Sequence, residues 1–390
     1  MMASLGRRWA AIGLCIGWFG CGGNGKPVVQ QPPPAVATQV PASASELRYE
    51  GRFEGDPASP HFEWPGSTVW LRFEGTSAAG TDVKVTLGER SLENDDYGQV
   101  AHDWYDVAID GKPAAALQVD EGVHSYLVAQ GLAKGEHVVA LRRRTEAYVG
   151  EGELDGFELG PGARVLPAPA ATRRIEFIGD SITAGFGVDG SDRSCLFSAQ
   201  TENYSHSYAA LTAQALGAEQ VAIAATGAGV YRNWGGSKDN TIGDLYDRAL
   251  PTHSTSRWNF ARWKPDVVVI NLGTNDFTSG DPGSANFTAA YRALLARVRQ
   301  NYPAALIVVA LGPMLSDLWP AGANALTQSR AYLTSVVSDA NAAGDAQVKL
   351  LEFDNQDQAA SFGCKFHPSA QTQQQMADKL SAFLRTQLHW

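Results

Sequence analysis

A serine and a histidine, far apart in the chain, have the residue types needed to attack an ester. Ser181 lies in residues 179–185 (Gly-Asp-Ser-Ile-Thr-Ala-Gly), and His367 lies in a His-Pro-Ser sequence ahead of the last predicted helix. A serine at a strand-to-helix turn can expose its hydroxyl, and histidine suits the role of its base because its pKa lies near the working pH. We expect Ser181 to be the nucleophile and His367 the base. Read alone, Gly-Asp-Ser is also typical of a turn with a helix-capping serine.

Two further segments could stabilise the negative charge that such an attack creates. Residues 225–229 (Ala-Thr-Gly-Ala-Gly) follow one predicted strand and residues 273–276 (Gly-Thr-Asn-Asp) follow another. Glycine lets a backbone N–H face a ligand, and an asparagine amide can be aimed at an oxyanion. Candidate donors are the N–H of Ser181, a backbone N–H of the glycine segment and the side-chain amide of Asn275. Either segment read alone is also typical of an ordinary turn.

The segments that must position these residues alternate between strand and helix patterns. Strands are predicted at residues 175–179, 221–224, 267–270, 305–311 and 348–353, and helices at residues 207–216, 289–300 and 372–388. Most of these strands are largely apolar, which is typical of a parallel sheet covered by helices on both faces. Ligands bind beyond the carboxyl ends of such strands, and three of the four motifs directly follow one. We therefore predict a three-layer α/β/α domain over residues 171–390.

The preceding segment, residues 47–160, has a different period. Its short runs tend to alternate apolar and polar side chains, as at residues 68–73, 83–87, 105–109 and 137–142. Turn residues separate these runs, so the pattern predicts an all-β sandwich in which each sheet buries one face. Residues 160–172 (GPGARVLPAPAAT) mark the boundary between the two domains.

Taken together, the four motifs resemble, in order, the blocks of the SGNH hydrolases, also called the GDSL superfamily. The resemblance implies that Gly227 supplies the glycine donor of the oxyanion hole, with Gly229 as the second choice, and that Asn275 supplies the amide donor. Most of these hydrolases have an aspartate three residues before the histidine, where it orients the ring, but here Cys364 takes that place. A sulfur cannot stabilise an imidazolium as a carboxylate does. We expect a backbone carbonyl to orient His367, which gives a Ser-His dyad. The alternative is another acid, with Asp354 and Asp357 the nearest candidates in sequence.

The absence of this aspartate and the sandwich predicted before the hydrolase domain point to one family within the superfamily. Residues 48–390 are similar to carbohydrate esterase family 2, and the likeness is carried by residues 62–67, 107–111, 144–147 and 175–187. The resemblance implies an N-terminal jelly-roll domain followed by an SGNH hydrolase domain. It also implies removal of O-acetyl groups from plant-type polysaccharides or oligosaccharides, without a metal or other cofactor.

Three aromatic residues beside the motifs are candidates for substrate binding: Tyr231, Trp234 and Phe366. Flat rings can stack on sugar faces, although core packing is the alternative for each of them. Two other functions stay open. One is a carbohydrate-binding surface lipoprotein with an inactive esterase site, and the other is a lipase or thioesterase on the same fold.

The chain has four cysteines, of which Cys15 and Cys21 belong to the predicted export segment. The remaining pair, Cys195 and Cys364, is an even number in an oxidising compartment and predicts a disulfide, with two buried free thiols as the alternative. No CxxC or HxxxH spacing occurs, so no metal site is expected.

Residues 1–21 have the features of an export signal. Two arginines precede twelve mostly apolar residues, too short a stretch to span a bilayer as a helix. Cys21 follows a glycine and precedes a flexible tract, which resembles a bacterial lipoprotein box and predicts lipidation of Cys21. Soluble secretion is the alternative. Residues 22–46, rich in Pro, Gln and Ala, are predicted to be a disordered linker.

The net charge of −10 argues against a nucleic-acid partner, because neutralising phosphates needs a basic surface. The expected partner is an acetylated polysaccharide or oligosaccharide. We expect the protein to be a monomer, exported, that meets the membrane only through its lipid anchor.

Overall fold

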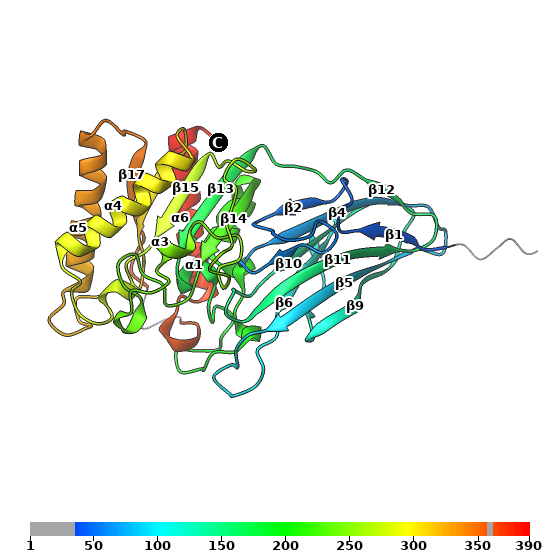
Figure 1. Ribbon diagram of the computed structural model, residues 1–390, viewed down its shortest axis with the longest axis horizontal. Helices are drawn as coiled ribbons and strands as arrows, with labels where there is room; N and C mark the ends of the chain where they lie inside the picture. Colours follow the sequence, from blue (N-terminus) through cyan, green and yellow to red (C-terminus); the bar gives the residue numbers. More distant parts are fainter. Residues whose placement is uncertain (1–35, 357–361) are drawn as a thin grey trace, which may run out of the picture. The chain divides into compact units, whose positions relative to one another are not determined.

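The computed structural model describes residues 36–356 and 362–390, and Val36–Trp390 form one compact unit. The predicted export segment, the candidate lipidation site Cys21 and most of the predicted linker lie outside the described residues. Antiparallel strands make up the first part of the described chain, and strands and helices alternate in the second (Figure 1). None of the helices that the structure describes combines the length and the apolar character that a membrane span requires.

Two antiparallel sheets form the first part. One has the order β1 (Thr38–Pro41), β11 (Gly150–Leu159), β5 (Thr81–Ser91) and β9 (Gly122–Leu132), with β3 (His61–Phe62) also paired to β11. The other has the order β12 (Arg164–Leu166), β4 (Thr68–Gly75), β10 (Gly135–Arg143), β6 (Trp104–Ile109) and β7 (Lys112–Pro113), with β2 (Arg48–Glu50) on β4 and β8 (Leu117–Gln118) on β6.

The alternation of side chains along these strands builds a core between the sheets. In β5, Val83 and Val85 are fully buried, whereas Lys84 between them is exposed. Successive side chains of a strand point to opposite faces, so one face of β5 packs with residues such as Leu71 of β4 on the other sheet. The predicted β-sandwich is thus confirmed.

Two short strands lie in segments predicted to be irregular. β1 falls in the predicted linker of residues 22–46, and β12 falls in the predicted boundary of residues 160–172. The sandwich therefore begins by Thr38 and not at residue 47. Val40 of β1 is 2% exposed, and all four residues of β1 pair with β11. A strand with one buried apolar side chain shows no period of two, so pairing with its neighbour decides its structure.

The second part contains a parallel sheet in the order β14 (Ala218–Ala224), β13 (Arg173–Gly179), β15 (Val267–Asn271), β16 (Leu306–Leu311) and β17 (Val348–Glu352). One face is covered by α2 (Tyr208–Leu216) and α6 (Ala370–Leu388), and the other by α3 (Ile242–Leu245), α4 (Ser284–Asn301) and α5 (Ala325–Ala342) (Figure 1). Phe177 and Ile178 are neighbours in β13 but belong to the cores on opposite faces. The predicted three-layer α/β/α arrangement is confirmed. α5 is absent from the predicted helices because its Ser, Thr and Asn residues have modest helix propensity.

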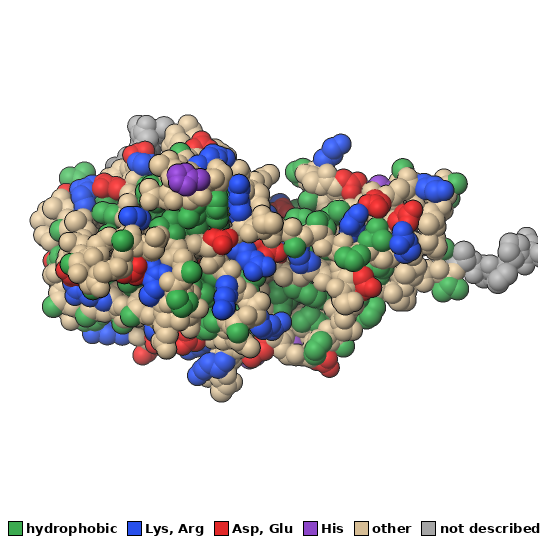
Figure 2. All heavy atoms as spheres, turned by 90° about the horizontal axis from the view of Figure 1, so that it is seen from above, with side chains coloured by type: hydrophobic (Ala, Val, Ile, Leu, Met, Phe, Trp, Pro, Cys, Tyr) green, Lys and Arg blue, Asp and Glu red, His purple; other side chains and the backbone are tan. Residues whose placement is uncertain are grey.

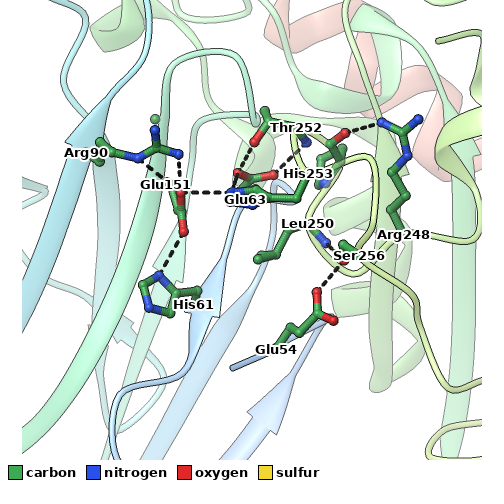
Figure 3. Close-up of polar contacts among 12 residues, drawn as sticks. Glu54, His61, Glu63, Arg90, Glu151, Arg248, Leu250, Thr252, His253 and Ser256 are labelled. Carbon is green, nitrogen blue, oxygen red and sulfur yellow. Dashed lines mark hydrogen bonds and ion pairs between the residues drawn. The ribbon is translucent and has the colours of Figure 1, made fainter. Parts of the chain in front are cut away.

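Charged side chains are mixed on the surface but form buried pairs and hydrogen bonds where the two parts meet. On the face shown in Figure 2, basic and acidic side chains are interspersed. At the junction, Arg52 of the sandwich and Glu176 of β13 form an ion pair at 3.3 Å, with both side chains 0% exposed. Glu63 accepts a hydrogen bond from the backbone N–H of Thr252 at 2.9 Å and another from its hydroxyl (Figure 3). Buried polar contacts therefore join the sandwich to the α/β part.

Candidate active site

Ser181 is the first residue of the short helix α1 (Ser181–Ala184), directly after β13. The carboxylate of Asp180 caps this turn by accepting a hydrogen bond from the N–H of Ile182 at 3.0 Å, and burial raises the pKa of Asp180 to about 7. Gly185 ends the turn with a φ of 80°, in the left-handed region that favours glycine. β13 lies between β14 and β15, where the strand order reverses. Open α/β sheets bind ligands at this position.

His367 follows the helical turn η5 (Cys364–Phe366) and contacts Ser181. Its Nε2 lies 2.8 Å from the Ser181 Oγ, and its Nδ1 lies 3.3 Å from the carbonyl oxygen of Cys364 and 3.2 Å from that of Lys365. A carbonyl oxygen only accepts hydrogen bonds, so the Nδ1–H donates to these oxygens and Nε2 is left to accept from the serine hydroxyl. Burial lowers the pKa of His367 to about 4, and the ring of Phe186 packs 4.4 Å away, centre to centre.

Two alternatives were open for the group that orients His367, a carbonyl or an acid. Asp354 is directed elsewhere, because its side chain is 87% exposed and its carboxylate lies 2.7 Å from the Nζ of Lys379. Asp357 lies outside the described residues. Among the residues that the structure describes, the acceptors beside Nδ1 are the carbonyl oxygens of Cys364 and Lys365.

The loop that carries these carbonyls is held from two sides. A disulfide joins Cys364 to Cys195, and the N–H of Cys364 donates to the carbonyl of Gly187 at 2.9 Å. Lys365 and Phe366 have φ values of 50° and 62°. Non-glycine residues rarely adopt this region, at a cost of about 1–3 kcal/mol each. The disulfide and the hydrogen bonds therefore stabilise a loop conformation that the local sequence disfavours.

The glycine expected in the oxyanion hole lies in the loop after β14. Gly227 has a φ of 77°, and its carbonyl accepts a hydrogen bond from the N–H of Trp234 at 2.8 Å. The N–H of Gly229, the second choice, already donates to the side chain of Asn233 at 3.1 Å. This contact favours Gly227 as the donor.

Asn275 lies in the turn η4 (Asn275–Phe277) that follows β15. Its Nδ2 donates to the carbonyl of Ala228 at 3.0 Å and lies 3.4 Å from the carboxylate of Asp180. The amide of Asn275 thus connects its own turn to the glycine loop, which we define as residues 225–229, and to Asp180, which caps α1. The next residue, Asp276, has a structural role. Its carboxylate accepts hydrogen bonds from the backbone N–H groups of Val230, Tyr231 and Arg232.

Ser181, Asn275 and His367 line one pocket of about 580 Å³. Trp234 and Phe366 also line it, and their side chains are 69% and 55% exposed. Tyr231, the third residue expected to bind substrate, and Gly227 are not among the lining residues of this pocket. The ring of Tyr231 packs against the core of the α/β part, and its hydroxyl accepts a hydrogen bond from Lys238 at 2.7 Å.

One wall of the pocket comes from the loop after β16, which the sequence analysis does not nominate. Leu318 and Trp319 line the pocket and are 83% and 61% exposed. A signal for this wall exists, because the loop directly follows an apolar strand and so stands at the same edge of the sheet as the motifs. Arg193 and Phe362 also line the pocket, from loops with no such signal.

Among the described residues, one cluster away from this pocket could hold a metal ion. Ligand atoms of Glu63, Glu151 and His253 lie within 4.8 Å of one another (Figure 3). The carboxylates are already bonded, Glu63 to Thr252 and Glu151 to the guanidinium of Arg90 at 2.5 Å. The cluster is therefore satisfied as a network of ion pairs and hydrogen bonds, without an ion.

Two family models match the chain, one for each part. The model described as "Carbohydrate esterase 2 N-terminal" matches residues 49–169, and that of the "GDSL-like Lipase/Acylhydrolase family" matches residues 177–375.

Several proteins that match most of this chain are carbohydrate-active. Cellulase/esterase CelE of Acetivibrio thermocellus is 39% identical over 345 residues, which are 88% of this chain but only 40% of CelE. An "acetylxylan esterase / glucomannan deacetylase" of Cellvibrio japonicus is 29% identical over 344 residues, 84% of this chain and 86% of that protein. A solved family two carbohydrate esterase from Clostridium thermocellum, in complex with cellohexaose, has a TM-score of 0.80 at 39% identity and matches 88% of this chain and 99% of that one.

Proposed function

Because this chain belongs to carbohydrate esterase family 2, we propose that it is a serine esterase that removes O-acetyl groups from polysaccharides or oligosaccharides. The observation that carries the proposal is the 2.8 Å contact between the Ser181 Oγ and the His367 Nε2, at the wall of an open pocket. The names of the relatives favour acetylated xylan or glucomannan as the substrate. The exposed rings of Trp234 and Trp319 support this, because flat apolar rings stack on sugar faces.

The proposed reaction is an acyl transfer in two steps. His367 accepts the proton of the Ser181 hydroxyl through Nε2 while the Oγ attacks the acetyl carbonyl. The N–H groups of Ser181 and Gly227 and the amide of Asn275 stabilise the oxyanion. The bond between the acetyl carbon and the sugar oxygen then breaks, the imidazolium gives its proton to that oxygen, and the sugar alcohol leaves an acetyl-serine behind. A water, activated by the same imidazole, releases acetate and restores the serine.

Ser181→Ala tests the assignment of the nucleophile. We expect the variant to lose at least about 10⁴-fold in kcat for acetate release from acetylated xylan, because no other group can carry the acetyl. The measurement is chromatographic quantification of acetate, with circular dichroism to show that the fold is kept. Equal rates for wild type and variant would refute the assignment, and an inactive wild type would favour the binding protein with an inactive site.

Apolar side chains in the pocket are also compatible with a lipase or thioesterase, so this alternative needs a test. Leu315 and Leu318 are among the lining residues, and they could contact an acyl chain as well as a sugar. Comparing 4-nitrophenyl acetate with the decanoate decides between them. An acetyl esterase is expected to have a higher kcat/KM for the acetate, and the reverse order would replace the sugar esterase with a lipase.

We also propose that the protein is exported, anchored through a lipid on Cys21 and monomeric. The support for export and the anchor is the sequence of residues 1–25, in which an apolar stretch leads to Gly-Cys and a glycine-rich tract. Detergent phase partitioning of the protein made in a bacterial host, compared with Cys21→Ser, tests the anchor. The wild type is expected in the detergent phase and the variant in the aqueous phase, where light scattering should give the mass of one chain. Equal partitioning of the two would remove the anchor from the account.

A further inference from the structure

Two buried carboxyl groups that the proposed reaction does not use lie beside the glycine loop. Glu146 stands between β10 and β11 of the sandwich, and Glu202 follows the turn η1 (Ala199–Thr201) of the α/β part. Glu146 is 2% exposed and Glu202 is 0% exposed. Two ionised carboxylates side by side in a protein interior repel each other and lose their hydration, so the pair is stable when it holds at least one proton.

Glu146 is bound to the loop that carries the oxyanion donor. Its Oε2 accepts a hydrogen bond from the N–H of Thr226 at 2.5 Å, and its Oε1 accepts one from the Thr226 hydroxyl. Thr226 immediately precedes Gly227. Two charge-assisted hydrogen bonds to one residue fix both its position and its orientation.

Glu202 contacts Glu146. In the described part of the chain, the carboxyl of Glu202 meets the side chain and the backbone N–H of Glu146, and both of its oxygens are buried. Burial, together with the charge of Glu146, raises the pKa of Glu202 well above its ordinary value, and burial raises the pKa of Glu146 to about 7. A buried carboxyl beside a second carboxyl keeps its own proton, which Glu202 can donate to Glu146. The pair then carries one negative charge, near the buried guanidinium of Arg143.

We propose that Glu202 and Glu146 form a proton-sharing pair that positions the oxyanion hole. Glu202 donates to Glu146, Glu146 holds Thr226, and Thr226 sets the direction of the Gly227 N–H. This inference rests on the proposed esterase function and deepens it. It makes Glu146 a positioning residue supplied by the sandwich, so the sandwich is part of the active site and not only a neighbour of it.

Variants matched in size test the pair. Glu202→Gln keeps a neutral side chain with an N–H donor and is expected to retain kcat within about threefold, whereas Glu202→Leu removes the donor. Glu146→Gln loses one acceptor oxygen. Thr226→Val loses the hydroxyl bond, and Thr226→Ser keeps it as the conservative rescue.

The expected pattern separates positioning from folding. Glu202→Leu, Glu146→Gln and Thr226→Val should lower kcat by about 10- to 100-fold, less than the roughly 10²–10³-fold loss of a whole donor, with a much smaller change in KM. Thermal unfolding and circular dichroism are measured on every variant. Wild-type kcat per folded molecule in Glu146→Gln would overturn the inference, whatever the change in Tm. If Glu146→Gln does not fold, equal kcat values for Thr226→Ser and Thr226→Val would overturn it.

The rate at which a 4-nitrophenyl phosphonate labels Ser181 gives a second readout that needs no acetyl substrate. Its phosphoryl oxygen takes the place of the oxyanion, so the same variants should be labelled more slowly than wild type. A wild type that is labelled but does not hydrolyse acetyl esters would contradict the proposed function alone. Equal labelling rates in all the variants would contradict the positioning pair alone.

Discussion

The proposed chemistry depends on the neutral form of one imidazole, that of His367. A protonated ring cannot accept the proton of Ser181, so activity falls as the pH falls through the pKa of His367. Burial lowers this pKa to about 4, against about 6.5 for an unperturbed histidine. We therefore expect protonation of His367 to give an acid limb of kcat/KM near pH 4, below any step from Glu146 and Asp180, whose pKa values are about 7. Acetate release across acidic pH, with the fold checked at each pH, measures this limb, and complete loss of activity of the folded enzyme already at about pH 5.5 would contradict the role of burial.

Several site residues could be predicted because their positions follow from the fold. Ser181, Gly227 and Asn275 each follow a strand of one parallel sheet, and the carboxyl ends of such strands meet at one edge. Tyr231 was expected to bind substrate but does not line the pocket, and Trp319 lines it but was not expected there. Both lie in loops, where the direction of a side chain depends on contacts such as that of Tyr231 with Lys238, which no local pattern reveals.

The element on which His367 depends is the loop held by the Cys195–Cys364 disulfide. The bridge spans 169 residues of sequence, and removing a bridge of this kind costs about 2–4 kcal/mol of stability. We expect Cys195→Ser and Cys364→Ser to lower the free energy of unfolding and also kcat, because the carbonyls that orient His367 lie in this loop. Urea unfolding and acetate release measure the two effects.

The double variant is the control for the disulfide. Both single variants remove the same bond, so the double variant should be no less stable than either one. Additive losses would mean that the two cysteines act separately, as two free thiols would.

Elements with a strong period could be predicted, and elements without one could not. The apolar runs of β15 and β16 indicate buried strands from sequence alone. β1 has one buried side chain and α5 has weak helix formers, so partners far away in the sequence decide their structure. The pair of Glu146 and Glu202 could not be predicted for the same reason, because the two residues are partners far apart in the sequence and meet only when the two parts pack together.

At the scale of the whole molecule, the junction between the sandwich and the α/β part contains the buried ion pair of Arg52 and Glu176. Removing one partner of such a pair leaves an uncompensated charge and costs about 3–5 kcal/mol. Arg52→Met is therefore expected to be strongly destabilised in urea unfolding. Replacing both partners with Met should restore part of the loss, because no buried charge is then left alone.

Arg72→Met is the matched control, because Arg72 pairs with Glu136 at 2.6 Å on the surface. Exposed pairs contribute about 0–1 kcal/mol, so this variant should unfold almost as the wild type does. Equal losses in Arg52→Met and Arg72→Met would show that the junction does not depend on its buried pair.

The order of the two domains and the family could be predicted from motifs spread over both parts. The contacts at the junction could not, because a buried arginine looks like a surface arginine in the sequence. One of these contacts is the hydrogen bond between Glu146 and Thr226, which crosses the boundary between the sandwich and the α/β part.

The most direct test of the central claim is to find the acetyl group on the enzyme during turnover. The wild type is mixed with an acetyl ester, quenched with acid within the first turnovers, digested and analysed by mass spectrometry. The account predicts one acetyl group on the peptide that contains Ser181, and none on that peptide in Ser181→Ala. Rapid turnover with an unmodified Ser181, or with the acetyl on another side chain, would contradict it.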